Sequence, residues 1–190
     1  MKVFTRTALV LSLGLSAFGA MAGQVVNSTV NATSVSNTSG GLGSSALQNI
    51  GVAEGNGRIA NSAVVVTGAS NLSAGLGSSA RQNIGFASGN GQILNSQVRV
   101  QNARNTSAGL GTSATQQIGF ATGNGRVQNS LVTALNVTNT AAGLGSSATQ
   151  EIGGAANNGV LQNTTVLANG ASNTSGGLGS SATQRIGVAR

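Results

Sequence analysis

The chain has 190 residues and a formal net charge of +7, and it contains no Cys, His, Pro, Trp or Tyr. It also has no Asp and only two Glu, so the residues that supply general bases, activated nucleophiles and zinc ligands are missing. Its few aromatics, all Phe, are too sparse to stack nucleic-acid bases. We therefore expect no enzyme, no metal site, no cofactor, no disulfide and no specific nucleic-acid partner.

The N-terminal segment, 1–22, has the pattern of a bacterial secretory signal peptide. Lys2 and Arg6 precede an apolar run from about Ala8 to Phe18, and Ala20-Met21-Ala22 forms a small-x-small site before Gly23. A transmembrane anchor is the alternative, but it needs about 20 apolar residues. We therefore expect a secreted protein, located outside the cell or in a surface fibre of a bacterium, with no membrane span in the mature chain.

From Gly23 onward, the sequence follows a fixed 34-residue period without insertion or deletion. The octapeptide GLGSSATQ occurs at 143–150 and again at 177–184, and near-copies of it start at positions 41, 75 and 109. A fixed period of this length is typical of solenoids and arrays. The predicted single repeat domain, 23–190, divides into a half repeat 23–40, repeats 41–74, 75–108, 109–142 and 143–176, and a half repeat 177–190.

Each repeat predicts, in chain order, a strand at about 44–53, a turn at about 54–57, and one longer or two shorter strands over about 58–71. A second turn follows through TSGGLG or its equivalents; the clusters GNG and GLG are typical turn sequences. The alternation of side chains slips near Asn61-Ser62 and near Gly68, which predicts a bend or bulge. A flat two-sided coil and a three-sided coil both fit. Helical repeats of this length exist, but 30 glycines and many β-branched residues disfavour helix.

If one repeat forms one coil, equivalent residues of successive repeats stack about 4.8 Å from one another. The predicted fold is therefore all-β, a cross-β solenoid with one 34-residue repeat per coil and about five coils per subunit, stacking head to tail. One strand face is expected to point inward and to carry Ala, Gln, Ile and a Val or Phe. The predicted core column is Ile50, Ile84, Ile118, Ile152 and Ile186. The last inward column is expected to be Val52, Phe86, Phe120, Gly154 and Val188.

Amide side chains recur at three fixed positions of the repeat. Stacked identical amides can bond along the stack, each NH2 to the next C=O. We expect such a ladder for Gln48, Gln82, Gln116, Gln150 and Gln184, because Gln has no turn preference. For Asn27, Asn61, Asn95, Asn129 and Asn163, a ladder and a turn with left-handed backbone both fit. The same two alternatives hold for Asn37, Asn71, Asn105, Asn139 and Asn173.

The predicted mature chain begins and ends part-way through a repeat. Gly23 falls in the column of Gly57, and Arg190 falls in the column of Glu54. Uncapped coils expose unpaired strand edges, and head-to-tail stacking of such ends gives an open filament. The predicted assembly interface is Glu54, Arg190 and Gly23, with an ion pair between Glu54 of one subunit and Arg190 of the preceding one. A frayed terminus at Arg190 is the alternative.

Opposite charges also share one column on adjacent coils. Glu151 and Arg185 occupy the same position of successive repeats, so we expect them to pair within one subunit. The remaining arginines of the repeat domain are scattered: Arg58, Arg81, Arg99, Arg104 and Arg126. They are expected to be solvated side chains, and binding of anionic glycans, extracellular DNA or cell surfaces is the alternative.

The stretch SATQQIGFATGNGRVQN at 113–129, with its counterparts in the other repeats, resembles the subunits of curli-type functional amyloid. The resemblance implies a cross-β fibre of self-associated subunits, with a nucleator or an outer-membrane export channel as further partners. The leading hypothesis is a secreted structural subunit that self-assembles into extracellular amyloid-like filaments for biofilm matrix, sheath or surface attachment. The alternative is a monomeric secreted β-solenoid that binds a target, as an adhesin or an ice-binding protein does.

Overall fold

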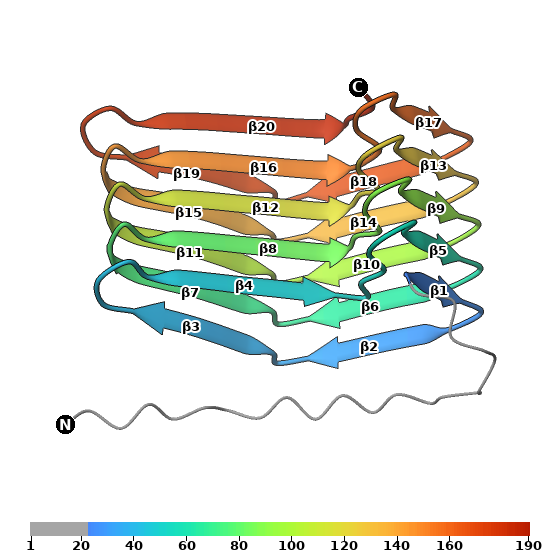
Figure 1. Cartoon of the computed structure of the whole chain (residues 1–190), viewed down its shortest axis with the longest axis horizontal. Helices are drawn as coiled ribbons and strands as arrows, with labels where there is room; N and C mark the ends of the chain where they lie inside the picture. The colour runs from blue at the N-terminus through green and yellow to red at the C-terminus, as the bar shows by residue number, and fades with distance from the viewer. Residues whose placement is uncertain (1–22) are drawn as a thin grey trace.

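The computed structural model describes residues 23–190, and the predicted signal peptide at 1–22 lies outside them. The described residues form β-strands and no helix. Strands from successive repeats pair in parallel and stack into five coils, from the N-terminal strands at the bottom of Figure 1 to the C-terminal strands at the top. The predicted fold, an all-β solenoid with one 34-residue repeat per coil, is confirmed.

Each coil contains four strands. The first has β1 (Gln24–Val26), β2 (Thr29–Thr33), β3 (Ser36–Gly40) and β4 (Ser45–Ile50). The second has β5 (Arg58–Ala60), β6 (Ala63–Thr67), β7 (Ser70–Leu76) and β8 (Ser79–Gly85). The third has β9 (Gln92–Leu94), β10 (Gln97–Gln101), β11 (Arg104–Leu110) and β12 (Ser113–Gly119). The fourth has β13 (Arg126–Gln128), β14 (Leu131–Leu135), β15 (Thr138–Leu144) and β16 (Ser147–Gly153). The fifth has β17 (Val160–Gln162), β18 (Thr165–Asn169), β19 (Ser172–Gly176) and β20 (Ser181–Gly187).

Equivalent strands of the five coils form four parallel sheets. Sheet A is β1-β5-β9-β13-β17, sheet B is β2-β6-β10-β14-β18, sheet C is β3-β7-β11-β15-β19, and sheet D is β4-β8-β12-β16-β20. The paired residues are equivalent positions of successive repeats throughout, as in Val64↔Val98 and Ile118↔Ile152. Each sheet has five strands. If a coil is taken to begin with its sheet A strand, residues 23–190 contain five coils of four strands. The half repeats at the two ends arise because the sequence repeat is counted from GLG.

The coil is flattened, with sheet D packed on sheets B and C and the short sheet A at one end (Figure 1). This arrangement has two main layers, which decides between the two-sided and three-sided coils. The second part of the repeat contains three strands, as in β5, β6 and β7, where the sequence pattern predicts one or two. The breaks between them fall at Asn61-Ser62 and at Gly68-Ala69, close to the predicted slips in alternation.

Apolar side chains fill the interior in two main clusters and one small group of alanines, Ala114, Ala141 and Ala148, between sheets C and D. The larger lies between sheets B and D and includes Val64, Val98 and Ile84, all buried. The smaller lies between sheet A and the loops that follow sheet D, where Ile59 packs with Ala53 and Ala87. The apolar columns of the sequence therefore mark the core.

Sheet D is shorter than predicted, because a glycine with left-handed backbone ends each strand. Gly85 has φ +82°, and a Cβ at this position would lie 3.0 Å from the side chain of Val98 and 2.8 Å from the carbonyl oxygen of Gly119. The next column therefore lies in a loop and does not continue the inward strand face, which corrects the expectation for Val52, Phe86, Phe120, Gly154 and Val188. Phe120 itself has φ +80° and is buried.

Candidate assembly interface

The asparagine column of sheet C forms a continuous hydrogen-bonded ladder. Each side chain donates from Nδ2 to the Oδ1 of the asparagine one coil further along. The four distances are 3.1 Å for Asn37 to Asn71, 2.8 Å for Asn71 to Asn105, 2.7 Å for Asn105 to Asn139 and 2.8 Å for Asn139 to Asn173. All four bonds point in the same direction along the solenoid.

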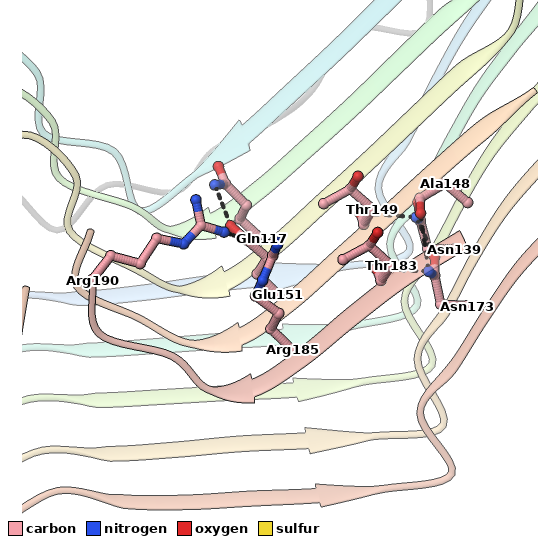
Figure 2. Close-up of polar contacts among 9 residues, drawn as sticks. All are labelled: Gln117, Asn139, Ala148, Thr149, Glu151, Asn173, Thr183, Arg185 and Arg190. Atoms are coloured by element: carbon pink, nitrogen blue, oxygen red, sulfur yellow. Dashed lines mark hydrogen bonds and ion pairs between the residues drawn. The ribbon is translucent and has the colours of Figure 1, made fainter. Parts of the chain in front are cut away.

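The same amides also join sheet C to sheet D. Asn139 donates to the backbone carbonyls of Ala114 at 3.0 Å and Thr149 at 2.9 Å. Asn173 makes the equivalent bonds to Ala148 and Thr183, as Figure 2 shows. Because the amides of the three inner coils are fully buried, these bonds offset the cost of removing each amide from water.

The glutamine column of sheet D points into the interior, and three of its four steps are bonded. Gln184 donates to Gln150 at 2.6 Å and Gln150 donates to Gln116 at 2.7 Å, both toward the N-terminus. Gln48 donates to Gln82 at 3.2 Å, toward the C-terminus. The direction therefore reverses between Gln82 and Gln116, and the Nε2 atoms of these two buried residues have no acceptor among the described residues.

The other asparagine column lies at the exposed corner between sheets A and B. Asn61, Asn95, Asn129 and Asn163 all have left-handed backbone, with φ between +48° and +50°. Asn95 donates to Asn61 at 3.3 Å and Asn129 donates to Asn95 at 3.2 Å, both exposed to solvent. These residues are turn residues that also form a short side-chain ladder at the surface, so the two alternatives coexist there.

The two asparagine columns differ in the residues that follow them in the sequence. Each corner asparagine precedes Ser or Thr in a turn, as in Asn61-Ser62, with no strand residue following at once. Asparagines of sheet C precede Thr or Leu inside an extended run, as in Asn71-Leu72. Ser follows four of the five corner asparagines and Thr follows four of the five in sheet C, so a β-branched neighbour is more frequent in the buried column, although Asn163 also precedes Thr.

The isoleucine column shows how the two ends of the solenoid differ. Ile84, Ile118 and Ile152 are fully buried and Ile50 is 7% exposed, as predicted for the core. Ile186 is 54% exposed, so its predicted place in the core of the subunit is wrong. A strand of sheet D packs on the sheet B strands of its own coil and of a neighbouring coil; β16, for example, contacts β14 and β18. Of the sheet B strands, β20 packs on β18 alone. Ile186 thus lacks the contact with a sheet B strand of a following coil.

Charged residues gather where the fourth coil meets the C-terminal coil. The Glu151 carboxylate has a side chain only 4% exposed and accepts from Nη1 of Arg185 at 3.1 Å, which places the predicted pair in contact. It also accepts from Arg190 and, at 3.0 Å, from Nε2 of Gln117 (Figure 2). Two guanidinium groups and an amide therefore surround one buried carboxylate.

Glu54 is exposed, and no ion-pair partner for it is found within residues 23–190. Within one chain, Gly23 lies beside the backbone of Glu54 and Gly55. Arg190 instead lies on Glu151, in a coil far from Glu54. The predicted pair between Glu54 and Arg190 joins two subunits, so it stays a prediction.

The chain matches no protein-family model, no curated protein and no solved structure. In the described part of the chain, no helix has the length and apolarity needed to cross a membrane. The candidate interface therefore rests on the geometry of the two end coils.

Proposed function

We propose that this protein is a secreted structural subunit that self-assembles head to tail into extracellular amyloid-like filaments. The observation that carries the proposal is the asparagine ladder of sheet C, whose two ends are complementary. Asn173 ends the ladder as a donor without a further asparagine, and Asn37 begins it as an acceptor without a preceding one. A second copy placed beyond the fifth coil would continue the ladder from Asn173 to its own Asn37 in the same direction.

The four sheets support the same arrangement. Within residues 23–190, strands β17–β20 and β1–β4 each have one edge without a partner strand. In the 34-residue register, Ile50 of the incoming copy would follow Ile186, Gln48 would follow Gln184, and Val30 would follow Val166. The side chains that would meet at the junction are therefore those that already stack inside the subunit. Unpaired parallel edges of this kind are templates for another chain.

Apolar burial supplies a driving force for the junction. Ile186 is 54% exposed, whereas its equivalent Ile152 is packed beneath β18 and fully buried. Within the subunit, β18 covers β16 of the preceding coil. Strand β2 of an incoming copy, which carries Val30, would cover β20 in the same way. Burying Ile186 in this way contributes about 1 kcal/mol or more, in addition to the backbone bonds of four new strand pairs.

The role of the filament as biofilm matrix, sheath or surface attachment rests on the resemblance to curli-type subunits. Export from the cell rests on the predicted signal peptide. A nucleator or an outer-membrane export channel would be an additional partner. The predicted pair of Glu54 with Arg190 would form at the same junction if Arg190 left Glu151.

Electron microscopy and fibre diffraction of the purified protein test the proposal. We expect unbranched filaments with a meridional reflection at about 4.8 Å, the spacing of paired strands along the solenoid axis. Sedimentation across a concentration series should show a critical concentration above which added protein enters the filament. A chain that stays monomeric at high concentration would refute the filament and favour the monomeric binding module.

A further inference from the structure

Sheet D carries a polar column on its outward face, between the inward glutamine and isoleucine columns. This outer column consists of Asn49, Asn83, Gln117, Glu151 and Arg185. Asn83 donates to Gln117 at 2.7 Å, and Gln117 donates to Glu151 at 3.0 Å. Arg185 donates to Glu151 at 3.1 Å from the other side. Every step from Asn83 to Arg185 is therefore bonded.

The two ends of the outer column are incomplete in opposite ways. At the N-terminal end, Oδ1 of Asn49 is buried and has no donor among the described residues. At the C-terminal end, Arg185 bonds to Glu151 through Nη1, and its side chain is 48% exposed. A guanidinium group has five N–H donors and no acceptor. One end therefore lacks a donor, and the other has donors to spare.

We propose that Arg185 of one subunit donates to Oδ1 of Asn49 of the next subunit, so that one guanidinium bridges Glu151 and Asn49 across the junction. The proposal rests on the proposed filament and names the polar contact that sets its register. Parallel pairing of β20 with β4 of a second copy, in the 34-residue register of sheet D, places Asn49 directly after Arg185. The partner is thus a second copy of this chain, bound through its first coil.

The same contact selects the direction of stacking. The C-terminal coil presents Arg185 and Arg190, both half-exposed. A tail-to-tail pair of subunits would bring four guanidinium groups to one edge, and like charges at an interface oppose association. The N-terminal coil instead carries the unpaired Oδ1 of Asn49, which is buried within the subunit and would face the open edge of β4 once the side-chain amide turns over. Only head-to-tail stacking pairs the surplus donors with the missing acceptor.

Two substitutions at Asn49 test the contact. Asn49→Leu removes the acceptor at similar volume, and we expect the critical concentration for assembly to rise about tenfold. Asn49→Asp keeps an acceptor and adds a charge opposite to Arg185, so the critical concentration should fall at low salt and return toward the wild-type value at high salt. Asn83→Leu is the matched control one coil inward: it should lower the melting temperature but leave the critical concentration within about twofold of wild type.

The readouts are sedimentation for the critical concentration and thermal unfolding, below that concentration, for the fold. Filaments of both Asn49 variants at the wild-type critical concentration would overturn the Arg185–Asn49 contact and leave the filament standing. If Asn49→Leu fails to fold, Asn49→Asp decides, because an unchanged critical concentration at low salt overturns the contact. A wild-type chain that forms no filament overturns the proposed function and the contact together.

Discussion

Asn105 donates its side-chain amide to the Oδ1 of Asn139 at 2.7 Å, one coil further along sheet C. The same amide donates to the backbone carbonyl of Thr115 in sheet D at 3.0 Å. One side chain therefore connects successive coils and also joins the two layers of each coil. Its neighbour Asn71 in turn depends on it as an acceptor, at 2.8 Å.

Asn105→Leu should lower the free energy of unfolding by about 2–4 kcal/mol, because it removes these bonds and leaves the buried amides of Asn71 and Asn139 incompletely bonded. Urea denaturation of the monomer measures the change. Asn95→Gly is the control, since it removes an exposed amide and keeps the left-handed backbone; it should change the stability by less than about 1 kcal/mol. Equal effects of the two substitutions would contradict a structural role for the buried ladder.

Ile186→Lys should abolish filaments while the monomer stays folded. The substitution places a charge on the apolar end of the C-terminal coil, where the incoming subunit would have to bury it. Leu178→Lys adds the same charge in the same coil at a turn residue that is 77% exposed. Electron microscopy should therefore show filaments for Leu178→Lys and none for Ile186→Lys. Filaments of Ile186→Lys with wild-type length would show that this end is not the interface.

Gly143→Ala should destabilise the fold by about 2 kcal/mol or more. Gly143 has φ +138°, and a Cβ there would collide with the carbonyl oxygen of Gly109 in the preceding coil. Gly123→Ala is the matched control, because the nearest atom to a Cβ at that position is the Cα of Gly89 at 4.0 Å. The control should stay within about 1 kcal/mol of wild type. Chemical denaturation measures the free energy of unfolding of both variants, one with a methyl group that collides with the backbone and one with a methyl group that has room.

Glu151→Gln should lower the stability by about 1–2 kcal/mol at low salt, since it removes the carboxylate shared by Arg185 and Arg190. The loss stays modest because both arginines are half-exposed and can be hydrated. Glu54→Gln makes the same chemical change at an exposed position and should alter the monomer by less than about 0.5 kcal/mol. Melting temperatures at low and high salt provide the test, and identical curves for the two variants would argue against the cluster.

The fixed period of the sequence is enough to predict the fold class, the stacking register and the isoleucine and valine columns of the core, but it wrongly continues the inward face through Phe86 and Phe120. In a parallel solenoid, the register is the repeat length itself, so no strand assignment is needed to align Ile84 with Ile118. The number of strands per coil is harder to predict. In the second coil, only the pair Gly68-Ala69 separates the sheet B strand from the sheet C strand. The pattern of apolar and polar residues does not show whether such a pair bends one strand or ends it.

Two further details depend on three-dimensional packing. The loop after sheet D takes left-handed backbone at Phe120, a residue that intrinsic preference places in a strand. Arg190 turns back onto Glu151, a contact between residues in different columns. Such a contact joins two different phases of the repeat, so the 34-residue period of the sequence does not predict it.

The constant 34-residue register has a consequence for how the gene of such a protein can change. Each coil packs mainly on the coils before and after it, so one whole repeat can be removed without changing the others. Removal of residues 75–108, for example, would place Gly109 directly after Ala74, at the position of the repeat that Gly75 now occupies. The asparagine column of sheet C and the glutamine column of sheet D would close over the gap with side chains of the same type, Asn71 next to Asn139 and Gln48 next to Gln116. Length is thus adjustable in whole units, and in-frame duplication or loss of one unit is the mutation that this architecture tolerates best.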